Sequence, residues 1–250
     1  MMSKKFGKPI VDRGMVLAVK LYKTDGINFT PAKLVATLKE RPYAPKKKGD
    51  ITAGFADVKT KVKTVRAEFV AGFNVPYLKY DPEGGLTPDY QLSVDKGVAF
   101  IKLDKNTVEV RGSGRLASRF KGVLEELTGC VLEPLNLNGG TKKLYDLATT
   151  VTSVALSELK KEASTLRQVQ FAGDDIKRED EIGLYTRKFD GKINRFRASF
   201  KFPSGEYKTV INADVGSLLL YRGGEGPYEK DLAWIVELME NSAPGIKKAA

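Results

Sequence analysis

The sequence predicts an α+β fold in which antiparallel sheets, arranged as β-meanders, are capped by long helices. Short segments of alternating apolar and polar residues, separated by turns rich in glycine and proline, predict the meanders. Segments with an apolar stripe at helical spacing predict the helices. With 250 residues, 42% of them hydrophobic and 29% charged, the chain can form one large soluble domain or two of moderate size.

The first elements are a strand over 15–22, which the Asp25-Gly26 turn closes, and a helix that begins at Thr30. Thr30 is a favourable N-cap, and the proline that follows it suits the first helical position. Valines and lysines then alternate over 56–65, which predicts a strand. Proline and glycine predict a loop over 80–90.

A hairpin over 97–111, with its turn near Lys105-Asn106, leads into a helix over 115–128. Gly129 supplies the C-terminal stop of this helix. The apolar stripe of the helix consists of Leu116, Phe120, Val123, Leu124 and Leu127.

After a connector over 132–141, an apolar stripe predicts a long helix over about 142–167. This stripe includes Leu144, Leu147, Val151, Val154 and Leu159. The acidic segment that begins at Asp174 or Asp175 is also expected to be helical.

The final third is predicted to be a meander followed by a helix that Pro227 opens. The strand over 193–202 is strongly amphipathic, because side chains alternate between the two faces of a strand. Phe196, Ala198, Phe200 and Phe202 share one face, and Arg195, Arg197, Ser199 and Lys201 share the other.

A weak internal repeat suggests that the chain consists of two similar halves. The segments over 108–127 and 218–239 both read as a strand, an Arg-Gly turn and a helix. On this reading residues 1–139 are a basic N-terminal α+β half and residues 140–250 a C-terminal α+β half. One continuous domain is the alternative.

Two absences limit the chemistry. The chain has no histidine, and Cys130 is its one cysteine. Mechanisms that need an imidazole base and structural zinc or iron–sulfur sites are therefore excluded within this chain. What remains is chemistry by carboxylates with a hard metal, by lysine or by tyrosine, and we expect neither a cofactor nor a metal.

The apolar part of the N-terminus is short and lacks a cleavage site, and no apolar run reaches the ~20 residues of a membrane-spanning helix. An intracellular, cytoplasmic protein without membrane contact is therefore expected. Few Gln and Cys together with many Lys and Glu favour a thermophilic source, archaeal or viral.

The formal net charge of +11 is concentrated in the N-terminal quarter. Residues 1–66 hold 16 Lys or Arg against 5 Asp or Glu, whereas residues 67–250 hold 26 against 26. Such an asymmetry indicates a polyanionic partner. The N-terminal cations comprise an arm with Lys4, Lys5 and Lys8, a loop with Lys46, Lys47 and Lys48, and the strand with Lys59, Lys61 and Lys63.

On a regular strand Lys59, Lys61 and Lys63 would form one row, ~7 Å apart, close to the spacing of phosphates along one nucleic-acid strand. An edge strand that lysines protect from aggregation explains the row equally well by itself. Tyr43 and Phe55 flank the basic loop and could stack on bases, although local packing is the more ordinary role.

Two other basic groups are candidates for phosphate contacts. Arg195, Arg197 and Lys201 share a strand face, and Arg111, Arg115 and Arg119 surround the turn "RGSGR". Cations near the start of a helix oppose the helix dipole, so an anion bound at that N-terminus would stabilise them. Gly112–Ala117 also fits G-x-G-x-x-A, but the alternating strand before it argues against a dinucleotide fold.

A metal-dependent nuclease is a third hypothesis. Glu206-x-Lys208, with Asp190 upstream, loosely resembles the carboxylate and lysine pattern that holds Mg²⁺ in such enzymes. The acidic cluster could also chelate a metal, although acids there are usually helix caps; it contains Asp174, Asp175, Glu179, Asp180 and Glu181.

The leading hypothesis is a non-catalytic nucleic-acid-binding protein that contacts mainly the phosphate backbone of DNA or RNA. The alternative is a structural or assembly subunit of a viral or multiprotein complex, as a homo-oligomer or with other proteins. The residues expected to contact phosphates are Lys46, Lys47, Lys48, Lys59, Lys61, Lys63, Arg111, Arg115, Arg119, Arg195, Arg197 and Lys201.

Overall fold

The computed structural model describes residues 9–10, 16–45, 50–137, 140–160, 165–223 and 226–246, and the statements below concern these residues. The chain divides into two compact units. The central unit is Thr24–Leu132, and the terminal unit combines Met1–Lys23 with Glu133–Ala250. The division into an N-terminal half over 1–139 and a C-terminal half over 140–250, or one continuous domain, stays a prediction.

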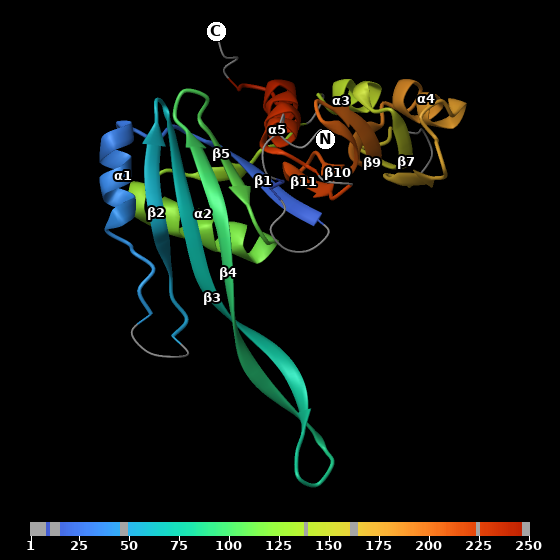
Figure 1. Ribbon diagram of the computed structural model, residues 1–250. Coiled ribbons are helices and arrows are strands. Elements are labelled where there is room, and N and C mark those ends of the chain that lie inside the picture. Colours follow the sequence, from blue (N-terminus) through green and yellow to red (C-terminus); the bar gives the residue numbers. More distant parts are fainter. Residues whose placement is uncertain are drawn as a thin grey trace, which may run out of the picture. The chain divides into compact units, whose positions relative to one another are not determined.

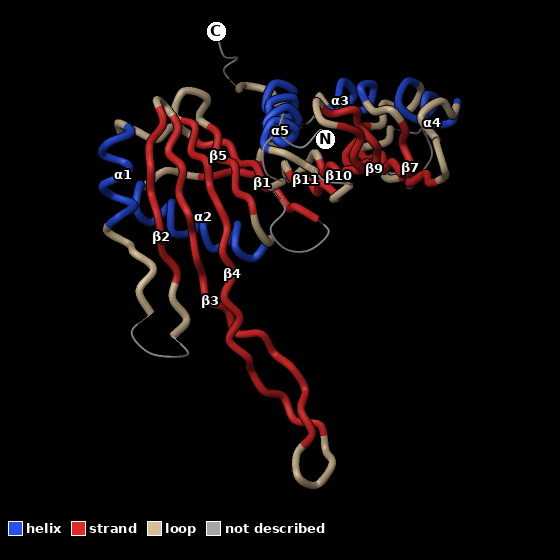
Figure 2. Tube along the Cα trace, viewed as in Figure 1, coloured by secondary structure: helices blue, strands red, loops and turns tan. Residues whose placement is uncertain are grey.

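The central unit is a meander with two helices packed on one face (Figure 1). Its strands pair in sequence order, each antiparallel to the next. The strands are β2 (Ala53–Lys61), β3 (Thr64–Tyr80), β4 (Leu86–Lys102) and β5 (Thr107–Arg111), and the helices are α1 (Pro31–Lys39) and α2 (Gly114–Thr128). The distal parts of β3 and β4 continue beyond β2 and β5 as a two-stranded ribbon (Figure 2).

The helix signals of the central unit are confirmed. The Thr30 side chain accepts a hydrogen bond from the Lys33 N–H at the start of α1, and Ser113 does the same for Leu116 in α2. Gly129 ends α2 with a φ of 71°, in the left-handed region that favours glycine.

The core of the central unit lies between the helices and the inner face of the sheet. The ring centroids of Phe55, Phe69 and Phe120 lie 5.3–6.2 Å apart. Four residues of the predicted α2 stripe are buried in this core, namely Leu116, Phe120, Val123 and Leu124.

The terminal unit contains an antiparallel sheet with the strand order β1-β11-β10-β9-β7-β8, and three helices. The short strand β6 (Leu132–Pro134) pairs with β1 outside this path. The other strands are β1 (Val16–Thr24), β7 (Thr150–Ser157), β8 (Val169–Ala172), β9 (Lys192–Phe202), β10 (Gly205–Asn212) and β11 (Ser217–Tyr221). The helices are α3 (Thr141–Leu147), α4 (Asp180–Arg187) and α5 (Glu229–Ser242).

The core of the terminal unit is aromatic. Phe200 and Phe202 of β9 pack against Trp234 of α5, with ring centroids 6.3 and 5.2 Å from that of the tryptophan. An apolar stripe at helical spacing begins at the N-cap residue of α5 and is buried; it consists of Tyr228, Leu232, Ile235, Val236 and Met239.

The prediction of sheets capped by long helices is wrong. Over the described residues the fold is mainly an open antiparallel sheet with five helices, of which α2 is the longest at 15 residues. The expected long helix over 142–167 is instead the seven-residue α3 followed by strand β7. The β-branched run Thr149–Thr152 favours a strand, and it outweighs the apolar spacing that strand and helix share here.

Three other boundaries differ from the prediction. The expected strand over 56–65 is a hairpin, because a turn at Val62 and Lys63 separates β2 from β3. The loop expected over 80–90 is shorter, since β3 extends to Tyr80 and β4 begins at Leu86. The acidic segment turns before it becomes helical, and α4 begins only at Asp180.

Candidate nucleic-acid interface

The terminal unit has an open sheet face that alternation along β9 makes basic. Phe196, Ala198, Phe200 and Phe202 are buried against the helices, whereas Arg195, Arg197 and Lys201 are exposed on the opposite face. The predicted amphipathic character of this strand is therefore confirmed. Successive outward side chains on a strand lie ~7 Å apart.

The register of β10 brings a fourth cation to this face. Arg197 of β9 pairs with Val210 and Ser199 with Lys208, so Lys208 lies diagonally beside Arg197. Sequence reasoning considered Lys208 only as part of a metal site. The alternation of Lys208 with the buried Tyr207 and Thr209 could have predicted that Lys208 is exposed. Its position beside Arg197 follows only from the register of β9 and β10.

The open face of the terminal unit is hollowed into a groove of about 770 Å³. Three cations line it, with Tyr221 and Gln170 as further polar groups and Asp174 as the carboxylate in its lining. We call this the β9 groove; its lining is Thr152, Ser153, Ala155, Gln170, Ala172, Gly173, Asp174, Arg195, Phe196, Arg197, Lys208, Val210 and Tyr221.

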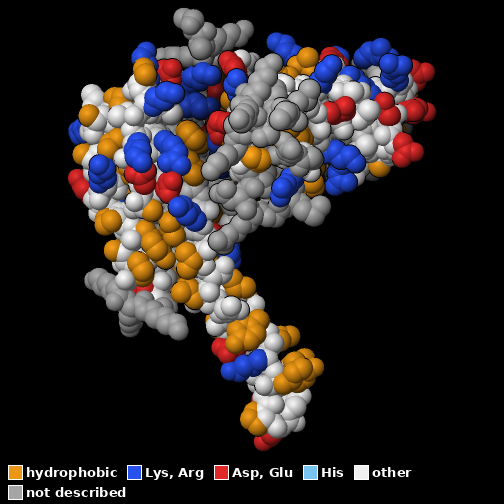
Figure 3. Space-filling model, viewed as in Figure 1, with side chains coloured by type: hydrophobic (Ala, Val, Ile, Leu, Met, Phe, Trp, Pro, Cys, Tyr) orange, Lys and Arg blue, Asp and Glu red, His pale blue; other side chains and the backbone are white. Residues whose placement is uncertain are grey.

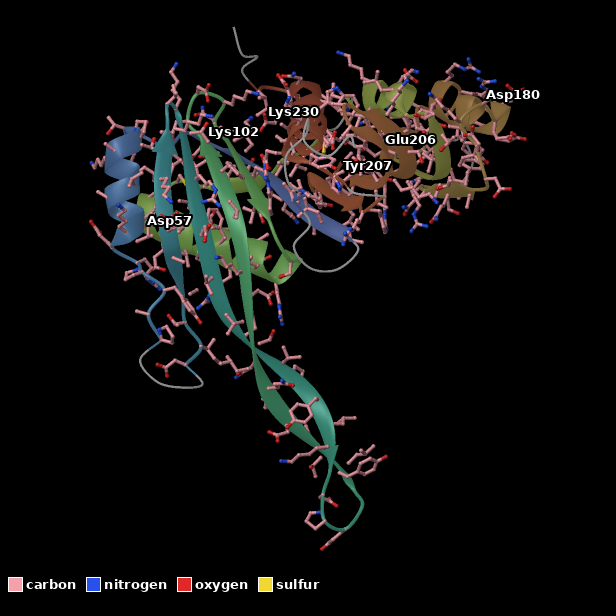
Figure 4. The ribbon with its side chains drawn as sticks, viewed as in Figure 1. Asp57, Lys102, Asp180, Glu206, Tyr207 and Lys230 are labelled. Atoms are coloured by element: carbon pink, nitrogen blue, oxygen red, sulfur yellow. The ribbon has the colours of Figure 1, made fainter. Side chains whose placement is uncertain are left out.

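The cations of the β9 groove form no ion pair within the described residues, although Asp174 also lines the groove. Within the described residues, Arg195, Arg197 and Lys208 form no ion pair, and neither does Lys201 beside them. Glu206, labelled in Figure 4, lies directly across the strand pair from Lys201, so the two side chains share a face. Positive charge is therefore exposed and available to an external anion.

The outer face of the central unit's sheet also carries cations, but carboxylates neutralise many of them. Lys59 lies 2.7 Å from Asp57, and Arg66 lies 3.0 Å from Glu68. Asp57 and Lys102, labelled in Figure 4, belong to this face, where Lys102 lies 3.3 Å from the buried Glu109. Such ion pairs reduce the positive electrostatic potential near this face, and therefore its attraction for a phosphate.

The three predicted strand lysines do not form one row. Lys63 lies in the β2–β3 turn, because Val62 there adopts a φ of 56° and the strand ends at Lys61. Lys61 and Lys63 are exposed, and neither forms an ion pair within the described residues. Lys46, Lys47 and Lys48 lie outside the described residues, as does the arm with Lys4, Lys5 and Lys8.

Two of the three arginines around "RGSGR" pair with different carboxylates. Arg111 pairs with Glu109 at 2.6 Å and stacks over the Phe100 ring at 4.2 Å. Arg115 donates two hydrogen bonds to Asp95, from Nε at 2.8 Å and Nη2 at 2.7 Å. Arg119 is exposed and has no ion pair among the described residues.

Asp95 supplies the anion that the start of α2 requires. Its Oδ2 accepts a hydrogen bond of 2.5 Å from the hydroxyl of Ser113, the N-cap residue. The Arg115 guanidinium lowers the pKa of the Asp95 carboxyl below its ordinary value. "RGSGR" is therefore a turn in which a carboxylate from β4 of the same chain neutralises Arg115, the cation in the first turn of α2.

The predicted stacking residues belong to the fold. Phe55 is buried in the aromatic core, and the Tyr43 N–H donates to the Phe55 carbonyl at 3.1 Å. The Phe55 ring is therefore not accessible to a base, whereas the Tyr43 ring is half-buried and its stacking role stays a prediction. In the β9 groove, Tyr221 lies among exposed cations and is more accessible than Phe196, the other aromatic residue of the lining.

The structure does not assemble the nuclease pattern. Lys201 faces Glu206, whereas Asp190 precedes the far end of β9, about 30 Å away along the strand. Asp190 pairs instead with Lys160 at 2.6 Å. Within the described residues, no group of three or more His, Cys, Asp or Glu side chains could hold a metal ion.

The acidic cluster has structural roles. Asp175 accepts hydrogen bonds from the Val151 and Lys177 N–H groups, which lower its pKa. Asp180 and Glu181 occupy the first turn of α4, where they complement the helix dipole. Asp174 instead lines the β9 groove.

A second hollow of about 550 Å³ lies between α3 and α4 of the terminal unit. Charges of both signs line it, and Lys142 pairs with Asp146 at 3.0 Å. The Lys177 ammonium donates to the carbonyls of Asp146 and Ala148. Because Lys142 and Lys177 already have partners, and Asp146, Glu179 and Asp180 line the hollow too, it is a weaker candidate for a phosphate site than the β9 groove.

No protein-family model matches the chain, and no curated protein matches its sequence. None of the helices in the described part of the chain is long and apolar enough to cross a membrane.

Proposed function

We propose that the protein binds nucleic acid through its phosphate backbone and that the β9 groove of the terminal unit is the principal contact surface. The observation that carries this proposal is the group of exposed Arg195, Arg197 and Lys208 side chains without carboxylate partners. Phosphate contacts from Arg and Lys position a nucleic acid without reading its sequence.

Three cations line the groove and a fourth lies beside it, at the spacing of outward side chains on a strand. Arg195 and Arg197 lie ~7 Å apart along β9, and Lys208 and Lys201 extend the same face. Serine, threonine and glutamine side chains between them can donate hydrogen bonds to phosphate oxygens. Tyr221 offers one ring for stacking on a base, which favours single-stranded over double-stranded nucleic acid.

The salt dependence of binding tests the electrostatic basis. Each neutralised phosphate releases close to one counter-ion, so four contacts give a slope of roughly −3 to −4 in log K against log salt. A titration of single- and double-stranded DNA and RNA at several salt concentrations, followed by fluorescence anisotropy, measures this slope. Binding that does not change with salt would contradict the proposal.

Paired variants locate the surface. The double variant Arg195→Gln with Arg197→Gln should weaken binding and make the salt slope shallower by about two. Lys142→Gln with Lys230→Gln removes the same charge from helices α3 and α5, which pack against the opposite face of the sheet, and should change binding little (Figure 4). Equal losses in both double variants would show that net charge alone is responsible.

A third double variant compares the two basic surfaces. Lys61 and Lys63 are the exposed, unpaired cations at the β2–β3 turn of the central unit. If Lys61→Gln with Lys63→Gln weakens binding more than the β9 double variant, the principal surface lies on the central unit and our assignment of the groove is wrong.

A further inference from the structure

The ribbon of the central unit has one apolar and one polar face. Strand pairing places Pro76 opposite Tyr90, Leu78 opposite Pro88, and Tyr80 opposite Leu86. These residues, together with Leu92 and Val94, share one face, which we call the apolar ribbon face; no charged side chain interrupts it between Gly72 and Tyr80 or between Leu86 and Val94.

The apolar ribbon face is open to solvent. Tyr80 is 75% exposed, Tyr90 65% and Leu78 64%. In the space-filling view hydrophobic side chains follow the ribbon and continue onto the adjoining part of the central unit (Figure 3). A two-stranded ribbon by itself is marginally stable in water, and a contiguous exposed apolar patch of this kind marks an interaction site.

On the opposite face of the ribbon, polar side chains form hydrogen bonds with one another. Asp89 accepts hydrogen bonds from the Lys79 ammonium at 2.7 Å and from the Tyr77 hydroxyl at 3.1 Å. These hydrogen bonds and that of the Tyr90 N–H lower the pKa of Asp89 to about 2. The ribbon therefore has one face suited to water and one face that lacks a cover.

Charge changes sign along the length of this surface. The tip loop between the strands carries Asp81 and Glu83. The apolar face follows, and beyond it lies the charged outer face of the sheet. That outer face carries the cations Lys59, Arg66, Lys96, Lys102 and Arg111 against the carboxylates Asp57, Glu68 and Glu109.

An acidic tip, an apolar middle and a base where five cations exceed three carboxylates, arranged in line, are complementary to a second copy turned by 180°. In that arrangement the two apolar faces cover each other, and each tip reaches the base of the other ribbon. Ten residues separate Tyr80 from Val70 along β3, a length of ~34 Å. We propose that the apolar ribbon face binds the same face of a second copy of this chain, as an isologous two-fold dimer.

The charge of the ribbon argues for this partner over nucleic acid. Residues 73–93 carry Lys79 against Asp81, Glu83 and Asp89, a net charge of −2 in a chain of +11. A polyanion would be repelled there, whereas a second basic copy is attracted to the tip. Eight apolar side chains cover on the order of 600 Å² per copy, at the lower end of specific interfaces, so the dimer should be reversible.

Adjacent substitutions on opposite faces of β4 test the proposal in the full chain. Tyr90→Asp puts a carboxylate on the apolar ribbon face, and Gln91→Asp puts the same group on the polar face one residue later. Sedimentation equilibrium over a wide concentration range should show a monomer–dimer equilibrium whose Kd rises at least about tenfold in Tyr90→Asp. The Kd should change little in Gln91→Asp.

The tip provides a second test. Glu83→Lys reverses a tip charge that has no ion pair within the described residues, and it should weaken the dimer more than Glu83→Gln does. A chain that stays monomeric at every concentration would overturn the proposal. Equal effects of Tyr90→Asp and Gln91→Asp, or no effect of either, would overturn it too.

Discussion

The carboxylate of Asp231 is the buried polar group on which we expect the terminal unit to depend most. Asp231 is 0% exposed, and it accepts hydrogen bonds from the Ser204 N–H at 3.0 Å, from the Ser204 hydroxyl and from the Tyr228 N–H at 2.8 Å. The Ser204 hydroxyl in turn lies 2.7 Å from that of Tyr207. One side chain therefore joins the start of α5 to the β9–β10 turn.

Asp231→Ala leaves two N–H groups and a hydroxyl without their acceptor in a buried site. Each unsatisfied buried group costs about 1–3 kcal/mol, and some relaxation is expected, so we predict a loss of roughly 3–5 kcal/mol in the free energy of unfolding. Asp231→Asn retains an acceptor and should lose less. Asp180→Ala, on exposed helix α4, is the control and should lose at most about 0.5 kcal/mol.

Urea unfolding followed by tryptophan fluorescence measures this effect, because Trp234 lies one turn of α5 away. A loss of less than about 1 kcal/mol for Asp231→Ala would refute the reasoning, since it would mean that water replaces the carboxylate without penalty. Nucleic-acid binding below the unfolding transition should stay close to that of the unchanged protein, because Asp231 lies on the helix side of the sheet.

Two further predictions concern the central unit. Arg115 lowers the folded-state pKa of Asp95, so the ionised carboxylate stabilises the fold above the unfolded pKa of about 4, and this stabilisation is lost as pH falls through the folded value. In Asp95→Asn, the free energy of unfolding measured against pH should lack this loss. A pH profile identical to that of the unchanged protein would contradict the role of Asp95. Phe120→Ala removes a fully buried ring that contacts Phe55 and Phe69, and should lower the free energy of unfolding by about 3–5 kcal/mol. Chemical denaturation measures this free energy. A loss below about 1 kcal/mol would mean that the core collapses around the cavity and would contradict the prediction.

Local signals predicted the elements whose determinants lie close together in the sequence. Thr30 with Pro31, Gly129, and the stripes of α2 and α5 each act within a few turns of helix, and the structure confirms them. Over 142–167 the apolar spacing fits either a helix or a buried strand. The choice of a strand at β7 depends on its pairing with β9 and β8, which are distant in sequence.

For the candidate site, too, the sequence predicted only what depends on residues close together in the chain. Alternation along β9 predicted that Arg195, Arg197 and Lys201 share a face. The addition of Lys208 depends on the β9–β10 register, and that of Gln170 on the β7–β8 pairing. Asp95 is 20 residues before Arg115, so the charge order of α2 indicated that an anion was needed but could not show that β4 provides it.

Net charge along a sequence and exposed charge in space are different quantities. The N-terminal quarter holds the whole formal excess, yet carboxylates from the same sheet lie beside Lys59 and Arg66 there. Residues 67–250 are neutral in sum, yet they present Arg195, Arg197 and Lys208 without partners, because their balancing acids are used elsewhere, as Asp175 is in backbone hydrogen bonds. A phosphate responds to the local potential, and for that reason the groove of the neutral segment is the better candidate for binding a polyanion.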